Sequence, residues 1–414
     1  MESQNGDAKG ANGRKRLAMQ VIVLMGLVSL LGDVTYEGAR SITGPYLAFL
    51  GASAAVVGFV AGAGEFFGYA LRLLSGYVAD RTERYWTMTL LGYGLIISIP
   101  LIAFAGNWEL VAVLLISERV GKAIRSPSRD TILSHATKQV GRGWGFAIHE
   151  ALDQVGAIIG PLLFSVVYVV SGGYREGFAL LWIPVILMIA ILLIARKKVP
   201  SPEKLEHTDD RKPVGSKDKL PRIFWLYTAF IIVTVVGFAN FQLISYHLSV
   251  NSIVSDVDIP IFYAIAMGVD GLVALVIGKA YDKIGIRALV MIPLLTIPIP
   301  ILGFTRSFGL AIVGVMLWGA VMGIHETIMR AAIADMTPTT RRGIAYGIFN
   351  TAYGASWFIG SAVMGLMYEF SVTYIIALVL IVEVASLPLF FVMRKEAKIK
   401  PQESKSLEDQ TDIQ

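Results

Sequence analysis

The chain has 414 residues, of which 55% are hydrophobic and only 16% are charged, and its mean hydropathy is +0.63. A soluble core of this length cannot bury so much apolar surface, so lipid must solvate most of the chain. The net charge of +5 does not indicate nucleic-acid binding, because Lys and Arg stand beside apolar runs and form no basic stripe. The sequence contains no cysteine, which excludes disulfides and cysteine-ligated metals.

Apolar windows of about 20 residues are typical of membrane-spanning helices, and the sequence contains twelve of them. Six windows precede a polar, proline-containing segment and six follow it, which predicts an all-α integral membrane protein with twelve transmembrane helices in two six-helix bundles. The predicted helices are 17–47, 53–79, 86–105, 109–131, 144–170, 176–196, 222–248, 258–281, 286–304, 308–332, 343–369 and 372–394.

The predicted organisation is a tail at 1–16, an N-terminal bundle at 17–196, a linker at 197–221, a C-terminal bundle at 222–394 and a second tail at 395–414. Residues 1–13 and the residues after Lys400 are polar and are expected to be disordered. Cations concentrate in the tails, the linker and every second loop, so the positive-inside rule predicts that both termini are cytoplasmic. We therefore expect a multi-pass protein of the cytoplasmic (inner) membrane.

A short charged turn follows the second predicted helix and returns after the eighth. The two copies are Gly76-x-x-x-Asp80-Arg81-x-x-Arg84 and Gly278-x-x-x-Asp282-Lys283-x-Gly285-x-Arg287. They stand roughly 200 residues apart, which indicates that half the chain is duplicated.

These turns resemble the motif that the major facilitator superfamily carries between helices 2 and 3 and again between helices 8 and 9. Glu83 stands where the family has a glycine, whereas the second copy keeps it as Gly285. Gly156-x-x-x-Gly160-Pro161 is similar to the antiporter signature of the family's exporters, without its final glycine pair. The resemblance implies a secondary transporter that functions as a monomer, has a proton gradient as its energy source and needs no cofactor.

Further motifs resemble a group of prokaryotic permeases and efflux proteins that carry only a generic transporter label. They are Asp33-x-x-x-Glu37, Arg125-Ser126-Pro127-Ser128-Arg129-Asp130 and Phe146-x-x-His149-x-x-x-Asp153. This resemblance narrows the group and implies a small-molecule substrate without specifying it.

The resemblance also implies a cytoplasmic latch, because the family places the aspartate of each turn near the start of a helix in the other half. Asp80 would then face the helix start around Gly343, and Asp282 the one around Gly143. A carboxylate at free backbone N–H groups is favourable by about 0.3 to 2 kcal/mol, which is weak enough to release. The expected gate residues are Gly76, Asp80, Arg81, Arg84, Arg125, Arg129, Asp282, Lys283 and Arg287. The alternative is that these cations only set topology.

Charged residues inside the predicted spans form two groups. Asp33, Glu37 and Arg40 share one face of the first helix, and His149, Glu150 and Asp153 lie within one turn of the fifth. Each charge costs about 2.5 to 3.5 kcal/mol at the centre of a bilayer, so these groups must pair or line water. We predict that they line a cavity and carry the proton. The alternative for the first group is a structural ion pair near the outer membrane surface.

His149-Glu150-x-x-Asp153 resembles the zinc motif H-E-x-x-H, but its second histidine is missing, so no metal site is predicted. A transported metal ion held also by His325 and Glu326 is an alternative. In the second half, neutral polar and aromatic residues predominate and favour a substrate wall. The candidates are Asn240, Gln242, Tyr246, His325, Glu326, Arg330, Asn350 and Tyr353.

The predicted function is proton-coupled export of a small molecule by alternating access, with Asp33 or Asp153 carrying the proton. The nearest alternative is a proton symporter or facilitator that imports a small organic anion held by Arg40 and Arg125. An enzyme or a receptor-like protein is disfavoured, because the sequence has no P-loop, complete metal motif or soluble domain. The missing P-loop also excludes an ATP-driven pump, and the two-bundle repeat disfavours a channel.

Overall fold

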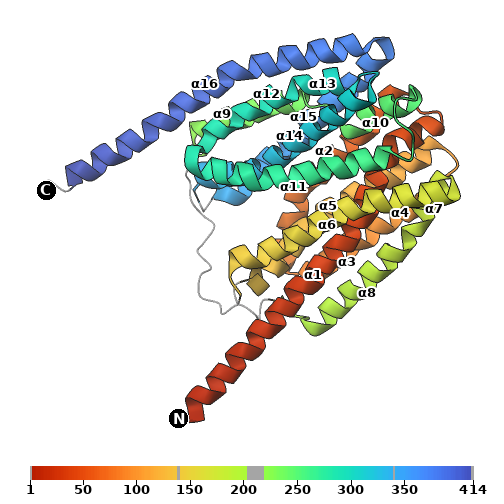
Figure 1. Ribbon diagram of the computed structural model, residues 1–414. Coiled ribbons are helices and arrows are strands. Elements are labelled where there is room, and N and C mark those ends of the chain that lie inside the picture. Colours follow the sequence, from red (N-terminus) through yellow and green to blue (C-terminus); the bar gives the residue numbers. More distant parts are fainter. Residues whose placement is uncertain (1, 138–139, 203–218, 339–340, 412–414) are drawn as a thin grey trace.

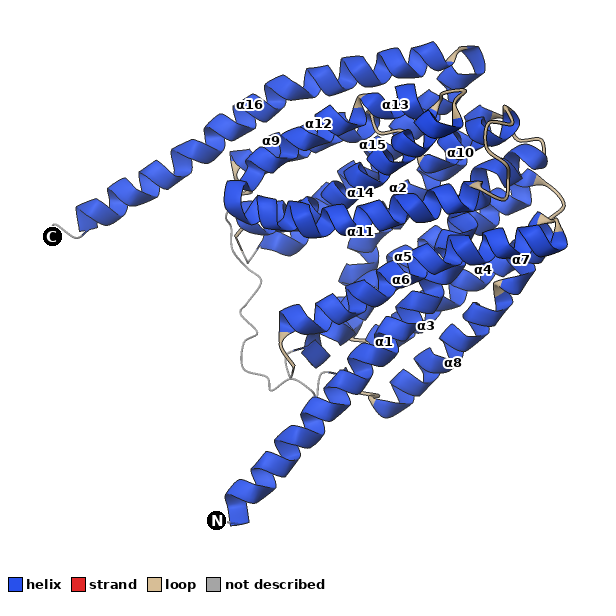
Figure 2. Ribbon diagram, viewed as in Figure 1, coloured by secondary structure: helices blue, strands red, loops and turns tan. Residues whose placement is uncertain are grey.

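The computed structural model describes residues 2–137, 140–202, 219–338 and 341–411, and these contain helices but no strand (Figure 2). The helices form two bundles, α1–α8 and α9–α16 (Figure 1). The N- and C-termini, the end of α8 and the start of α9 all lie on one side of the molecule, which is called here the termini side. Each of the twelve predicted windows falls on helical segments.

The first bundle contains eight α-helices and two short 3₁₀ segments. They are α1 (Glu2–Phe49), α2 (Ala54–Thr82), α3 (Tyr85–Gly94), η1 (Leu95–Ile97), α4 (Ser98–Leu101), η2 (Ile102–Phe104), α5 (Trp108–Thr137), α6 (Arg142–Ser171), α7 (Tyr174–Leu180) and α8 (Trp182–Lys198). Pro100 and Pro184 lie near two of the interruptions, because proline lacks an N–H and crowds the preceding turn.

The second bundle is also interrupted in two of its six predicted spans, 222–248 and 286–304. Its elements are α9 (Arg222–Val236), α10 (Phe241–Val250), α11 (Ile259–Ile284), η4 (Gly285–Val290), α12 (Met291–Thr296), α13 (Pro298–Gly303), α14 (Phe308–Met336), α15 (Arg342–Phe370) and α16 (Val372–Thr411). Pro298 and Pro300 follow the break between α12 and α13.

In the described part of the chain, nine segments are long and apolar enough to cross a membrane. One of them, Ile259–Gly303, contains α11 together with α12 and α13, and so covers two predicted helices. α5 and α15 are also of membrane length, but both are more polar than these nine. The protein is therefore a multi-pass membrane protein.

The prediction of disordered tails is wrong for the described residues. α1 already begins at Glu2, and α16 continues to Thr411. Starting a helix is the costly step and extending one is cheap, so a membrane span can carry its helix into an adjoining polar segment. Of the predicted linker, residues 203–218 lie outside the described ranges.

The predicted helix 222–248 is two helices, because the chain breaks at Gly237–Asn240. The Asn240 side chain caps α10 by accepting a hydrogen bond from the Leu243 N–H at 2.7 Å. The Trp318 indole N–H donates to the free carbonyl of Ala239 at 2.9 Å. Backbone groups released by the break thus find partners inside the protein, which a membrane interior requires.

The two bundles meet along close, glycine-lined contacts. A Cβ on Gly62 of α2 would lie 2.9 Å from the Phe358 Cα of α15, so the two backbones approach closely. On the side opposite the termini, the Ala55 N–H donates to Glu369 at 3.0 Å and the Ser165 hydroxyl donates to the Val257 carbonyl at 2.7 Å. These contacts join the bundles on that side.

Candidate functional site

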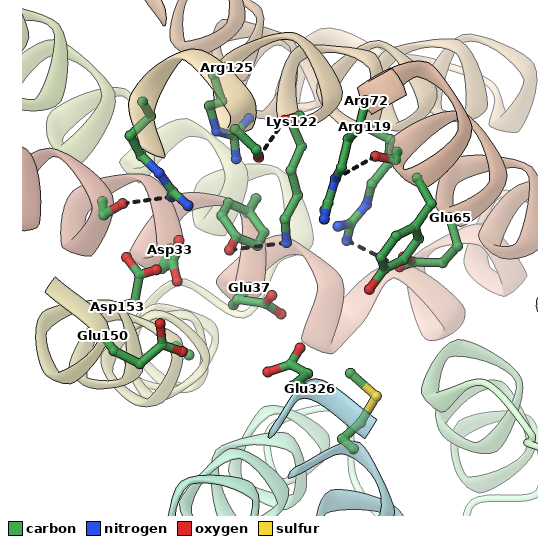
Figure 3. Close-up of a pocket in the computed structure, with 18 of the residues that line it drawn as sticks. Asp33, Glu37, Glu65, Arg72, Arg119, Lys122, Arg125, Glu150, Asp153 and Glu326 are labelled. Atoms are coloured by element: carbon green, nitrogen blue, oxygen red, sulfur yellow. Dashed lines mark hydrogen bonds and ion pairs between the residues drawn. The ribbon is translucent and has the colours of Figure 1, made fainter. Parts of the chain in front are cut away.

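A cavity lies between the two bundles and is lined by residues of both (Figure 3). α1, α2, α3, α5 and α6 contribute from the first bundle, and α11, α14 and α15 from the second. The volume of the cavity is about 160 Å³. This central position is where transporters of two-bundle architecture place their substrate site.

The first bundle supplies most of the charge. Its cationic lining residues are Arg40, Arg72, Arg119, Lys122, Arg125 and Arg129, and its acidic lining residues are Asp33, Glu37, Glu65, Asp130, Glu150 and Asp153. The described side chains of the second bundle add only Asp270 and Glu326. Buried charges at this density are costly unless they are paired or bind a ligand.

Arg40 is at the centre of an ion-pair network that joins α1 to α2. Its guanidinium lies 2.8 Å from Glu65 and 3.7 Å from Glu37. Glu65 also lies 3.8 Å from Arg119. Glu37 accepts a hydrogen bond from Tyr263 of α11, so the network extends into the second bundle. The charged face of α1 therefore lines the cavity, and its main ion pair is made with α2.

α5 presents a row of cations to the same cavity. Arg125 lies 3.3 Å from Glu118 and stacks near the rings of Tyr36 and Tyr93, at 5.5 and 5.1 Å from the ring centroids. Arg129 lies 2.9 Å from Asp130. Arg125 and Arg129 were expected at a cytoplasmic gate, whereas the structure places both in the cavity wall.

Close packing of α6 on α1 brings two aspartates together. A Cβ on Gly156 would collide with the Leu30 carbonyl oxygen, and one on Gly160 with that of Val34, so the glycines of the antiporter-like motif allow contact between the two backbones. Asp33 and Asp153 consequently lie side by side in the cavity (Figure 3).

His149, Glu150 and Asp153 each offer one ligand atom, and these atoms lie within 4.8 Å of one another. His149 Nδ1 is 3.8 Å from Asp153, and the histidine is buried beside the cavity. Lys122 and Arg129 line the same cavity and oppose a divalent cation electrostatically. The cluster does not include His325 or Glu326. His325 points toward Tyr353 instead, and its Nδ1 lies 3.3 Å from the Tyr353 hydroxyl.

The second bundle gives the cavity a less charged wall. Its lining residues are Tyr263, Met267, Asp270, Met322, Glu326, Met329, Ile333, Tyr346, Phe349 and Asn350. Thus Glu326 and Asn350 are the predicted substrate-wall residues that line the cavity.

The other predicted wall residues lie elsewhere. Gln242 lines a smaller pocket beside Arg40, and Asn240 is the cap of α10. Tyr246 packs against Tyr368, with ring centroids 5.7 Å apart. His325 and Tyr353 are buried behind the wall, and the side chain of Arg330 lies outside the described residues. The break in the predicted helix 222–248 explains Asn240, because it turns a wall position into a cap.

The site also contains residues that were not among the predicted ones, and three of them make contacts that hold it together. Tyr36 lies under the α5 cations, Tyr263 hydrogen-bonds to Glu37, and the Gln154 amide donates to the Met267 carbonyl at 2.6 Å across the bundles. Tyr36 stands three residues after Asp33 and four before Arg40, so helical spacing could have found it. For Tyr263 and Gln154 we see no comparable signal in the sequence.

The repeated turns end α2 and α11 on the termini side. Glu83 caps α2 with φ 55°, and Gly285 caps α11 with φ 56°. Among the described residues Asp80 makes no hydrogen bond or ion pair, and a Cβ on Gly343 would meet nothing within 4 Å. The predicted contact between Asp80 and the start of α15 is therefore not made among the described residues, and the helix start at Gly143 lies outside the described side chains.

Arg81 is held locally, since its guanidinium donates to the Tyr77 hydroxyl at 3.0 Å. Arg84, Asp282, Lys283 and Arg287 are exposed. Gly76 packs on Pro127 of α5, 3.6 Å from where a Cβ would lie.

Two membrane-embedded bundles around a central polar cavity define a membrane transporter that works by alternating access. The chain belongs to the major facilitator superfamily, whose sequence profile matches residues 22–299 and 254–411. Members of this superfamily do not normally need a cofactor.

Among its relatives is an uncharacterized protein of Mycobacterium tuberculosis, 40% identical over 94% of this chain and 98% of its own length. An uncharacterized MFS-type transporter of Methanocaldococcus jannaschii is 27% identical over 87% of this chain and 91% of its own. The fold is similar to a bacterial homologue of the human lysosomal transporter Spinster, in an inward-facing and occupied conformation. That similarity has a TM-score of 0.69 at 14% identity and covers 91% of this chain and 96% of that one.

Proposed function

We propose that the protein exports a small molecule across the cytoplasmic membrane in exchange for protons, with both termini in the cytoplasm. The observation that carries the proposal is the pair of Asp33 and Asp153, which α1 and α6 hold side by side in the cavity (Figure 3). Two adjacent carboxylates repel each other when both are ionised, so such a pair favours binding one proton.

The pair is placed where a proton can change the charge of the whole site. Lys122 and Arg129 line the same cavity, so loss of the proton strengthens the attraction between the aspartates and these cations. A ligand can shift a conformational equilibrium only by its different affinity for the two states. Proton binding meets this condition if the second bundle, which brings Asp270 and Glu326 to the cavity, lies at different distances from the aspartate pair in the two states.

The conformation supports loading from the cytoplasm. Ala55 and Ser165 make bundle-to-bundle hydrogen bonds on the side opposite the termini. On the termini side, Asp80 is exposed, and no described atom lies within 4 Å of a Cβ built on Gly343 at the start of α15. With the termini in the cytoplasm this is an inward-facing state, in which a substrate from the cell interior displaces the proton.

Import of an organic anion by Arg40 and Arg125 is less well supported. Arg40 is engaged with Glu65 and Glu37, and Arg125 with Glu118. Binding an anion there would require breaking a buried ion pair, which leaves a carboxylate without its partner.

Infrared difference spectroscopy on the purified full chain tests the proton site without knowledge of the substrate. A change of pH should produce a carboxylic-acid C=O signal that is reduced in Asp33→Asn and Asp153→Asn. Glu109→Gln, at an exposed position near the start of α5, is the matched control and should leave the signal intact.

Counterflow in proteoliposomes tests the coupling itself, with a labelled compound chosen from a thermal-shift panel. Both asparagine variants should exchange this compound but no longer respond to a pH gradient. If neither variant alters the infrared signal or the pH-driven transport, this assignment of the proton site is wrong.

A further inference from the structure

Two of the charged groups that line the cavity, one cationic and one anionic, make no ion pair with any described residue. Lys122 comes from α5 of the first bundle and Asp270 from α11 of the second, and both line the cavity. Three arginines of the first bundle differ from Lys122, because Arg40, Arg119 and Arg125 each form an ion pair with a carboxylate.

The Lys122 ammonium is held by an aromatic ring instead of a carboxylate. It donates to the Tyr36 hydroxyl at 3.3 Å and lies 4.5 Å from the centroid of that ring. Among the described residues no carboxylate oxygen lies within 4.0 Å of it. The ring orients the ammonium without neutralising it, so the ammonium retains its capacity to bind an anion.

Asp270 is the anionic group of the two. Its side chain is only 4% exposed, yet it lines the cavity and has no hydrogen bond or ion pair with any described residue. Gly323 of α14 packs against it, and a Cβ there would lie 2.8 Å from the carboxylate. Glu326, one turn further along α14, lines the same wall. Apart from Arg330, whose side chain is not described, this wall offers no cation.

A charge held in a poorly solvated site without a partner is unfavourable, and a ligand of opposite charge removes that penalty. An anion would be attracted by Lys122 but repelled by Asp270 and Glu326. A cation would be attracted by Asp270 but repelled by Lys122. We propose, on the basis of the proposed transport function, that the substrate is a zwitterion whose anionic group binds Lys122 and whose ammonium group binds Asp270.

The middle of the substrate would then contact the apolar part of the second wall. Met267, Met322 and Met329 line the cavity near Asp270 and Glu326 in the sequence of α11 and α14. Methionine side chains adapt to different shapes, so this wall suits a flexible aliphatic connection between the two charges. A zwitterion bound in this way bridges the bundles, because its two charges are held by different halves of the molecule.

Thermal unfolding of the purified full chain with defined probes tests this proposal. The zwitterionic probes are ω-amino acids of increasing chain length, from 4-aminobutanoate to 8-aminooctanoate. For each one, the methyl ester supplies the cation alone and the N-acetyl derivative supplies the anion alone. At least one ω-amino acid should raise Tm in a saturable manner, and both of its singly charged derivatives should bind about tenfold more weakly or worse.

Two variants should each lose recognition of one end of the probe. Lys122→Gln should bind the ω-amino acid and its methyl ester equally, because the anion site is lost. Asp270→Asn should bind the ω-amino acid and its N-acetyl derivative equally. Lys122→Arg should restore the preference for the zwitterion, and Lys279→Gln, at an exposed lysine of α11, should leave it unchanged.

The proposal is overturned if no ω-amino acid stabilises the wild-type chain, or if a singly charged derivative stabilises it as well as the zwitterion does. It is also overturned if both variants lose the same end of the probe. An overall loss of folding would appear as a lower Tm without ligand and would not produce this split. Binding is measured without a pH gradient, so failure of the zwitterion assignment is distinguishable from failure of proton coupling.

Discussion

The hydroxyl of Tyr263 in α11 donates a hydrogen bond to Glu37 in α1, and this bond links the two bundles through buried groups. Glu37 also faces Arg40, which in turn pairs with Glu65 of α2. A tyrosine of the less charged half is thereby attached to the ion-pair network of the charged half. Rocking of the bundles must stretch or break this bond.

Replacing Tyr263 with phenylalanine should lower the free energy of unfolding by about 1.5 to 3 kcal/mol, because the bond goes to a charged, buried group. The reduction is measured by thermal or denaturant unfolding of the purified protein. Tyr77→Phe is the control, since Tyr77 is exposed and bonds only to Arg81 of its own helix in the described structure. An equal loss in both variants would argue against a special role of the buried bond.

The absence of cysteine makes single-cysteine labelling straightforward in this chain. A membrane-impermeant maleimide should modify Ser126→Cys, which lines the cavity, from the termini side only. It should leave Ser165→Cys unmodified, because Ser165 is buried at the bundle contact that closes the opposite side. Labelling of Ser126→Cys from the opposite side alone would show that the resting state faces outward.

Asp80→Asn tests the latch proposed for the termini side. In the closed state the carboxylate would lie at the start of α15, where it contributes about 0.3 to 2 kcal/mol. Its loss should favour the open state and increase the labelling of Ser126→Cys in the presence of substrate. Glu109→Gln serves as the control, and an unchanged labelling rate in Asp80→Asn would remove Asp80 from the latch.

The two repeated turns should respond differently to glycine substitution. Glu83 has φ 55° and ψ 16°, a left-handed conformation that costs a non-glycine residue about 1 to 2 kcal/mol. Gly285 has φ 56° and ψ −140°, which is accessible almost only to glycine. Gly285→Glu should therefore destabilise the protein by about 1 to 3 kcal/mol, whereas Glu83→Gly should be neutral or stabilising. Unfolding midpoints of the two variants measure this difference, and equal losses would contradict it.

Glu383 of α16 is fully buried, and neither carboxylate oxygen has a hydrogen-bond partner among the described residues. A Cβ on Gly237, at the break between α9 and α10, would lie 2.5 Å from one of these oxygens. An ionised group here would be costly, so Glu383→Gln should keep Tm and transport unchanged, and Glu383→Lys should prevent folding. Loss of transport in a stably folded Glu383→Gln would instead give this carboxylate a role in the transport cycle.

Helical periodicity and the position of the linker were sufficient to predict the two bundles and the charged faces of α1 and α6. Asp33 and Arg40 line the cavity as expected, since helical spacing alone puts them on one face. The ion-pair partner of each charged side chain could not be predicted from the sequence. Glu65 pairs with Arg40, and the sequence alone does not specify this partner, because it depends on how α2 lies against α1.

The second wall was predicted less well, for reasons of local geometry. Asn240 and Glu326 were both predicted as polar wall residues. The helix break makes Asn240 the cap of α10, whereas Glu326 faces the cavity. His325 and Glu326 are neighbours in the chain and point in different directions, as adjacent residues on a helix do. Tyr263 makes the hydrogen bond to Glu37 that crosses between the bundles, yet in the sequence it looks like any other buried aromatic residue.

The division of charge between the bundles has a consequence for how such proteins diverge. The aspartate pair and its cations belong to the first bundle, whereas Met267, Met322 and Met329 belong to the second. Mutations at the methionine positions should change the shape of the accepted compound while leaving the aspartate pair proposed to bind the proton untouched. The shape of the accepted compound and the proposed proton coupling therefore depend on different halves of the chain, so each half can change without the other.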